Sequence, residues 1–138
     1  MLRGIKLEQN SSGEIGKAAL VLFAHGARDP RWAAPFQRLQ KITQAGAPSM
    51  VVELAFLEFM TPSLPDLVAH LVSQGINHIT VSPIFLGQGG HVLRDLPKMI
   101  EEVQEQFPTL VVKQIPAVGE NEAVLAAISA YCLSHVSS

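Results

Sequence analysis

The chain has 138 residues, of which 48% are hydrophobic and 16% charged, with a formal net charge of −2. This length corresponds to one domain, since domains commonly contain about 100–200 residues, and the apolar composition excludes a disordered chain. The net charge argues against a nucleic-acid partner bound through a broad basic face. Cys132 is the single cysteine, which excludes an intramolecular disulfide framework and indicates a reducing compartment such as the cytoplasm.

Residues 1–17 contain Ser, Asn, Gly and Glu before the first long apolar run, and we expect them to form a flexible tail. Residues 18–138 then form a single domain. The longest apolar runs, such as residues 18–24, are far shorter than the roughly 18 residues that a membrane-spanning helix needs. We therefore expect no membrane partner.

Short apolar runs alternate with longer amphipathic segments along the domain. The continuous apolar run at residues 18–24 predicts a strand buried on both faces, and the apolar spacing at residues 32–45 predicts a helix. In the last amphipathic segment the apolar stripe includes Cys132, which predicts that this helix packs on the core. The further expected elements are strands at 50–57, 78–83 and 110–115 and helices at 63–74, 93–107 and 121–135.

Strands separated by single helices predict parallel pairing, with helices on both faces of the sheet. We therefore expect an α/β fold, a flavodoxin-like three-layer sandwich with a four-stranded parallel sheet. In such sheets ligands bind beyond the carboxyl ends of the strands. The polar residues that follow each strand are therefore the candidates for a site.

Three potential metal ligands follow three different strands: His25, Glu58 and His91. Each has an ordinary alternative, as a turn residue, a solvated carboxylate and a helix cap respectively, but their coincidence on one rim favours a shared site. Glu53 lies earlier in the same strand as Glu58 and is expected to point to the opposite face. Imidazole and carboxylate ligands without a thiolate suit Co²⁺, Fe²⁺, Ni²⁺ or Zn²⁺ without choosing among them.

Basic residues and glycines surround the same rim. Arg28 and Arg94 follow the turns that carry the two histidines, and helix N-termini there also favour anions, which predicts an acidic ligand. The segment at residues 87–90 is rich in glycine but matches no phosphate-binding motif. Its small residues would instead allow a large, flat ligand to approach the backbone.

Four stretches of the sequence, taken together, resemble one family. Residues 24–30 (AHGARDP), 53–58 (ELAFLE), 62–65 (PSLP) and 81–92 (VSPIFLGQGGHV) are similar to the small sirohydrochlorin chelatases of the CbiX type. The resemblance extends over about residues 18–119 and implies the class II chelatase fold. The sequence departs from the family pattern at Ala24 and Ala27, where the family often has Gly and Ser.

The resemblance implies an activity: insertion of a divalent metal ion, Co²⁺ before Fe²⁺ or Ni²⁺, into sirohydrochlorin, a carboxylate-rich tetrapyrrole. It implies that His25 is a metal ligand and proton acceptor, that His91 is a metal ligand, and that Glu58 lies at the metal or the substrate as a second candidate for the catalytic base. No cofactor is implied beyond the substrate metal ion. The residues expected to bind the macrocycle are Arg28, Leu86, Gly87, Gln88, Gly89, Gly90 and Arg94.

Larger members of that family carry two lobes in one chain, with the macrocycle between them. A chain of 138 residues supplies one lobe, so the resemblance implies a homodimer, whose interface would cover some of the apolar surface. A second class of function stays open at this point. A metal or tetrapyrrole carrier without turnover would present the same rim of ligands.

Overall fold

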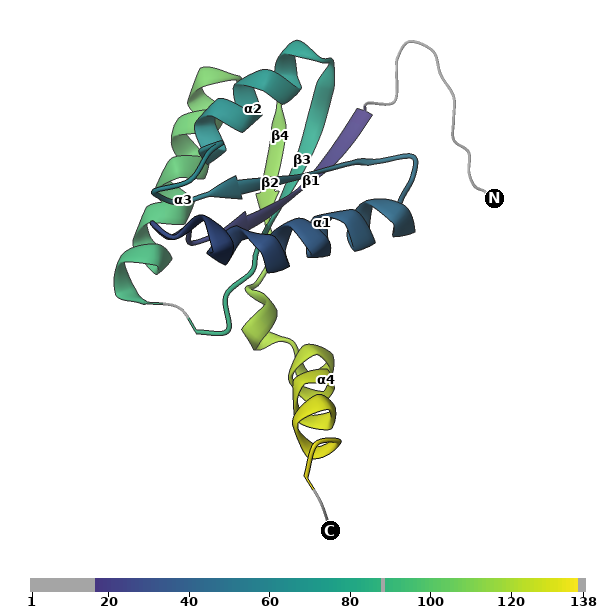
Figure 1. The fold of residues 1–138 in the computed structure, drawn as a ribbon. Coiled ribbons are helices and arrows are strands. Elements are labelled where there is room, and N and C mark those ends of the chain that lie inside the picture. Colours follow the sequence, from purple (N-terminus) through teal and green to yellow (C-terminus); the bar gives the residue numbers. More distant parts are fainter. Residues whose placement is uncertain (1–16, 88, 137–138) are drawn as a thin grey trace.

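The structure is a computed structural model that describes residues 17–87 and 89–136, apart from the side chains of residues 90–93. Its centre is a four-stranded parallel sheet with the order β2-β1-β3-β4 (Figure 1). The predicted order of elements is confirmed. The elements are β1 (Lys17–Ala24), η1 (Pro30–Ala33), α1 (Ala34–Gly46), β2 (Val51–Phe56), α2 (Leu64–Ser73), β3 (Ile76–Pro83), α3 (Gly90–Gln106), β4 (Val111–Gln114), η2 (Val118–Glu120) and α4 (Glu122–Leu133).

The expected three layers are present, with α1 on one face of the sheet and α2 and α3 on the other (Figure 1). The main core lies under α2 and α3, where Val21 and Phe23 of β1 pack with Leu67 and Leu71 of α2. These four side chains are almost fully buried. The apolar run of β1 is continuous because the strand is paired on both sides and covered on both faces.

Helix α1 also protects the edge strand β2. The Gln40 side-chain amide donates to the Val52 carbonyl at 2.7 Å, and the Gln44 side-chain oxygen accepts from the Val52 backbone N–H at 3.0 Å. Backbone groups on an edge strand would otherwise be open to pairing with another chain. These hydrogen bonds hold the second half of α1 beside the start of β2.

Helix α3 begins at Gly90, three residues before the expected start at residue 93. Gly89 is extended, with φ −71° and ψ 156°, and acts as the N-cap residue. The glycine run was interpreted as a loop, but extended Gly89 is followed directly by helical backbone. His91 therefore lies in the first turn of a helix rather than at the end of a loop.

The prediction that the last helix packs on the core is wrong. Helix α4 extends away from the sheet (Figure 1), and Leu125 and Ile128 are each 39% exposed. Cys132, expected in the core, is exposed. The helix itself forms, capped by the Asn121 side chain, which accepts from the Val124 backbone N–H at 3.1 Å. Because α4 is apolar on almost all sides, its sequence predicted a helix but could not show which side of that helix would be buried.

Residues 1–16 lie outside the described residues, so the expected tail at residues 1–17 overlaps the structure only at Lys17, which is already the first residue of β1. In the described ranges, none of the helices is long and apolar enough to span a bilayer.

Candidate functional site

The structure brings His25 and Glu58 together, although they follow different strands. The parallel register pairs Ala24 with Phe56, the last residues of β1 and β2. Backbone pairing then continues past the strand ends, because the Leu57 N–H donates to the Ala24 carbonyl at 2.9 Å and the Glu58 N–H donates to the His25 carbonyl at 3.1 Å. The two side chains therefore leave the backbone at the same level, and His25 Nε2 lies 3.6 Å from Glu58 Oε2.

Gly26 makes this close approach possible. Its φ is +94°, in the left-handed region that glycine favours, and a Cβ atom built there would lie 1.9 Å from the Glu58 carbonyl oxygen. No other residue fits between the two turns without moving one of them. The glycine after His25 is thus needed for the close packing of the two turns as well as for the backbone conformation of its own turn.

The pair is accessible from solvent, with the His25 side chain 38% exposed and the Glu58 side chain 43% exposed. The Phe85 ring contacts the His25 ring edge-on, with 6.5 Å between the centroids, and backs the imidazole from the β3 side. A separation of 3.6 Å is longer than a normal hydrogen bond. An imidazole and a carboxylate so placed offer nitrogen and oxygen donors to a cation, or accept protons.

The third predicted ligand, His91, has its backbone in the first turn of α3, but its side chain lies outside the described residues. Among the side chains that the structure does describe, no group of three or more His, Cys, Asp or Glu is placed to hold a metal ion. The structure therefore brings together two of the three predicted ligands, and the third stays a prediction.

Arg28 lies beside this pair on an aromatic support. Its guanidinium carbon stands 4.3 Å from the centroid of the Phe59 ring, a cation–π contact. Phe59 directly follows Glu58, is 55% exposed and has a positive φ of 66°. The sequence analysis missed Phe59; the one signal for it was the presence of an aromatic residue directly after the candidate carboxylate.

A cavity of about 380 Å³ opens beside Arg28 and Phe59. It is lined by Ala27, Arg28, Pro30, Ala33, Gln37, Phe56, Phe59, Met60 and Thr61.

The neighbouring Arg31 is engaged elsewhere. Its guanidinium donates to Asp29 at 2.6 Å, and its backbone N–H donates to the same carboxylate at 2.9 Å. These hydrogen bonds hold the pKa of Asp29 below its ordinary value and raise the pKa of Arg31. Arg28, by contrast, stacks on Phe59, the residue directly after Glu58.

The predicted macrocycle loop is held at its start. The Gly119 N–H donates to the Phe85 carbonyl at 2.9 Å, and a Cβ on Gly119 would lie 1.9 Å from the carbonyl oxygen of Leu86. By contrast, a Cβ on Gly87 or Gly89 would meet no described atom within 4 Å. The fold therefore does not itself require glycine at these two positions.

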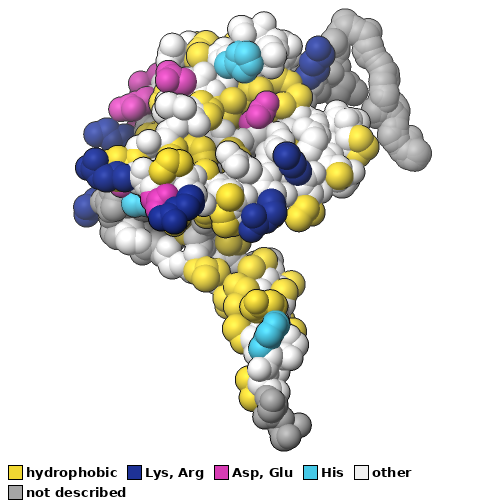
Figure 2. Space-filling view, in the orientation of Figure 1, with side chains coloured by type: hydrophobic (Ala, Val, Ile, Leu, Met, Phe, Trp, Pro, Cys, Tyr) yellow, Lys and Arg dark blue, Asp and Glu magenta, His cyan; other side chains and the backbone are white. Residues whose placement is uncertain are grey.

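The remaining predicted substrate residues lie at or near this loop. Gln88 lies outside the described residues, Gly90 opens α3 and Arg94 is exposed on α3. Figure 2 shows Lys and Arg side chains gathered on the side of the molecule where β1 and β2 end. Asp and Glu side chains lie among them, and binding of an acidic ligand at this rim stays a prediction.

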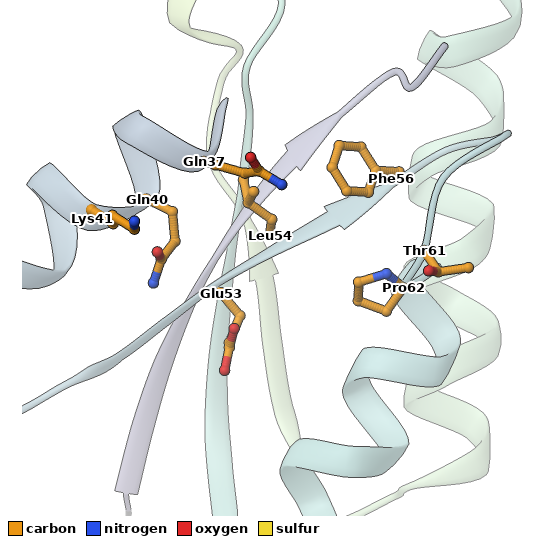
Figure 3. Close-up of a pocket in the computed structure, with 8 residues that line it drawn as sticks. All are labelled: Gln37, Gln40, Lys41, Glu53, Leu54, Phe56, Thr61 and Pro62. Carbon is orange, nitrogen blue, oxygen red and sulfur yellow. The ribbon is translucent and has the colours of Figure 1, made fainter. Parts of the chain in front are cut away.

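A separate hollow of about 390 Å³ lies along β2, between α1 and the Thr61–Pro62 turn (Figure 3). Glu53 of β2 and Gln40 and Lys41 of α1 line it. Neither His25 nor Glu58 lines it. The hollow shares Gln37, Phe56 and Thr61 with the cavity beside Arg28.

The chain is similar to proteins of known activity. The family model for CbiX matches residues 19–132. The sirohydrochlorin cobaltochelatase of Methanocaldococcus jannaschii is 32% identical over 87 residues, which cover 63% of this chain and 61% of that protein. The chloroplastic sirohydrochlorin ferrochelatase of Arabidopsis thaliana is 27% identical over 126 residues, covering 88% of this chain and 56% of that protein. The match thus spans less than two thirds of each of these relatives.

Solved structures agree with the fold. A putative cobalamin biosynthesis CbiX protein from Marinobacter aquaeolei is 29% identical with a TM-score of 0.77, and the match covers 85% of this chain and 95% of that one. SirB from Bacillus subtilis, solved with Fe³⁺, is 26% identical with a TM-score of 0.72, and the match covers 83% of this chain and 45% of that one. The chain belongs to the CbiX family, as its four sequence stretches and its four-stranded parallel sheet predict.

Proposed function

We propose that this protein inserts a divalent metal ion into a tetrapyrrole of the sirohydrochlorin class. The observation that carries the proposal is the His25–Glu58 pair, 3.6 Å apart on an accessible rim. Relatives named sirohydrochlorin cobaltochelatase and sirohydrochlorin ferrochelatase support it.

The chemistry needs the two groups that the pair offers. Insertion replaces two pyrrole N–H protons of the macrocycle with one M²⁺ ion, so two protons leave and the ion loses water ligands. A histidine has an ordinary pKa near 6.5 and accepts protons at neutral pH. In the proposal His25 and Glu58 hold the incoming ion, His91 completes the ligand set, and His25 or Glu58 accepts the protons.

The basic rim serves the carboxylates of the substrate. Arg28, supported by the Phe59 ring at 4.3 Å, and Arg94 on α3 are proposed to bind carboxylate side chains at the edge of the macrocycle. The open space at Gly87 and Gly89 supports the proposal that the loop from Leu86 to Gly90 runs along the flat face of the ring.

Cobalt is the proposed physiological metal, ahead of iron and nickel. Histidine and carboxylate ligands accept all three, but the cobaltochelatase of M. jannaschii is 32% identical, against 27% for the ferrochelatases of Arabidopsis and Bacillus. The single cysteine supports a reducing compartment, and we propose the cytoplasm. The match accounts for 45% of SirB, which supports a homodimer in which a second copy supplies the remaining lobe.

The proposed activity is tested by asking whether one protein molecule inserts metal into many molecules of sirohydrochlorin. The protein is incubated without oxygen with sirohydrochlorin and Co²⁺, Fe²⁺ or Ni²⁺ in separate reactions, and absorbance spectra are compared with the protein-free rate. Product in large excess over protein supports a chelatase, whereas a spectral change that stops at one equivalent identifies a carrier. His25→Ala should abolish turnover, and His78→Ala, an exposed histidine at the opposite end of the sheet, should retain it.

A further inference from the structure

The outer edge of β2 is covered near both of its ends but is open at Leu54. Along a parallel strand, the backbone groups of successive residues point alternately toward the two sides of the strand. The Leu57 N–H, just after β2, donates to the Ala24 carbonyl of β1 at 2.9 Å. The Phe56 N–H donates in the opposite direction, to the Pro62 carbonyl at 2.9 Å. The even-numbered residues of β2 therefore direct their N–H and C=O groups away from β1.

Two of these outward-facing residues have partners and Leu54 has none. Besides Phe56, Val52 is covered, because its carbonyl accepts from the Gln40 side chain at 2.7 Å and its N–H donates to the Gln44 side chain at 3.0 Å. Within residues 17–87 and 89–136, no group forms a hydrogen bond with the outward N–H or C=O of Leu54. One donor and one acceptor thus stay open side by side, between neighbours that are already paired.

The open backbone of Leu54 lies at a polar hollow. Leu54 lines the hollow of about 390 Å³ between α1 and the Thr61–Pro62 turn (Figure 3), and this volume is within the range of small-molecule sites. Lys41 of α1 and Glu53 of β2 line the same hollow with opposite charges. In the part of the chain that the structure describes, neither of them forms an ion pair. The hollow therefore offers a cation, an anion, a donor and an acceptor together.

We propose that this hollow binds one free α-amino acid, whose nitrogen donates to the Leu54 carbonyl and whose carboxylate accepts from the Leu54 N–H. In an antiparallel pair two facing residues can exchange both hydrogen bonds, so a single residue is enough to satisfy Leu54. The two charges of a free amino acid match the two charged side chains, since Lys41 would pair with the carboxylate and Glu53 with the ammonium group. This inference goes beyond the proposed metal insertion and does not depend on it.

Two other occupants are poorer matches. A longer extended chain would have to continue the pairing to Val52 and Phe56, where Gln40, Gln44 and the Pro62 carbonyl already supply the partners. A divalent cation would find one carboxylate in the hollow, that of Glu53, and the ammonium group of Lys41 beside it, whereas hard cations take six or more oxygen ligands. A ligand of one residue with both charges fits better than a strand or a metal ion.

The first test asks whether the edge is open in the unliganded protein. Hydrogen exchange of backbone amides is followed by NMR, and the Leu54 N–H should exchange at least about tenfold faster than its neighbours, because it has no hydrogen-bond acceptor in the protein. The N–H groups of Val52 and Phe56, with acceptors at 3.0 and 2.9 Å, serve as internal references. Equal protection of all three would overturn the proposal.

The second test is binding itself, without metal or tetrapyrrole. Protein labelled with ¹⁵N is titrated with each of the common L-amino acids up to about 10 mM, tenfold above a dissociation constant of ~1 mM. At least one should shift the Leu54 amide resonance saturably and slow exchange of that amide. The N-acetylated form of the same amino acid, which lacks the ammonium charge, should bind at least about tenfold more weakly. Absence of a saturable shift at Leu54 with every amino acid, or equal binding of the acetylated form, overturns the proposal.

The third test removes the two charges that line the hollow. Lys41→Gln and Glu53→Gln should each raise the Kd of that amino acid at least about tenfold, the usual effect of losing a hydrogen bond to a charged group. Arg38→Gln and Glu101→Gln are the matched controls, because both residues are exposed on helices and neither lines the hollow. Far-UV circular dichroism checks that all four variants are folded. Unchanged Kd values in the two hollow variants would contradict the assignment.

The neighbouring cavity provides a further control. It holds Arg28, a second cation that a carboxylate could reach, and shares Gln37, Phe56 and Thr61 with the hollow. Arg28→Ala should leave the Kd of the amino acid unchanged. Loss of binding in Arg28→Ala with retention in Lys41→Gln would place the ligand in that cavity and overturn the proposal. Metal insertion is assayed separately, so its failure would leave the result for this hollow intact.

Discussion

His25 Nε2 lies 3.6 Å from Glu58 Oε2, and the backbone of the two turns fixes that relationship before any side chain is considered. The hydrogen bond from the Glu58 N–H to the His25 carbonyl extends the β1–β2 ladder beyond the strands. The two candidate site residues therefore lie in turns that are hydrogen-bonded to each other directly after β1 and β2, and such support holds side chains in a defined geometry.

Glu58→Gln tests the carboxylate of this pair. The amide keeps the size of the side chain but cannot accept a proton or neutralise a cation, so we expect kcat for metal insertion to fall by about 10²–10⁴, the usual contribution of a general base. The melting temperature should change little, since the Glu58 side chain is 43% exposed. Steady-state kinetics and a thermal melt measure both. Full activity in the glutamine variant would remove Glu58 from the catalytic groups.

Gly26→Ala tests the backbone that holds the pair. The new methyl group would overlap the Glu58 carbonyl oxygen, and the φ of +94° is strained for alanine. We expect a loss of at least about 1–3 kcal/mol in the free energy of unfolding, the cost of a residue held in such a conformation. Urea denaturation measures it, with Gly87→Ala as the control, because a Cβ at Gly87 meets no described atom within 4 Å. Equal stability of the two variants would contradict this account of the turn.

The sequence was sufficient to predict the four strands and their succession along the chain, because a buried parallel strand such as β1 needs a continuous apolar run, but it did not predict their order in the sheet. It also placed His25 and Glu58 on one rim, since both follow strands that end at the same edge of the sheet. These predictions depend on local patterns and on the general geometry of parallel sheets. They need no knowledge of side-chain packing.

Three features needed the structure. The start of α3 at Gly90 depends on the backbone of Gly89, which glycine's freedom leaves open in a sequence. The position of α4 depends on how η2 packs against the Leu86 loop. The stacking of Arg28 on Phe59 depends on a positive φ at Phe59, which few phenylalanines adopt. In each case the deciding contact is non-local or the backbone is atypical, so periodicity carries no signal for it.

The Asp29 carboxylate predicts a pH dependence of stability. Hydrogen bonds from the Arg31 side chain, and then from its backbone, lower the pKa of Asp29 below 3.8 in the folded protein. A carboxyl group with a lowered pKa adds stability above its unfolded pKa, and this contribution disappears as the pH falls through the folded value. We expect the melting temperatures of wild type and Asp29→Asn to begin to converge as the pH falls below about 4, the ordinary carboxyl pKa, and to meet only below the lowered pKa of the folded protein. A difference that persists unchanged to pH 2 would contradict the assignment, and added salt should reduce the difference at pH 6, because the pair is exposed.

Arg28 and Phe59 predict a measurable coupling in substrate binding. If the ring holds the guanidinium in place for a substrate carboxylate, Phe59→Ala should raise KM for the tetrapyrrole while kcat stays nearly constant, since Phe59 is not among the groups proposed to hold the metal or accept protons. A double-mutant cycle with Arg28→Ala should give a coupling of about 0.5–1 kcal/mol, the usual strength of an exposed cation–π contact. Phe59→Tyr retains an aromatic face and should behave as wild type. Additive effects of Phe59→Ala and Arg28→Ala on KM would show that the stacking seen at 4.3 Å does not position Arg28 for the substrate.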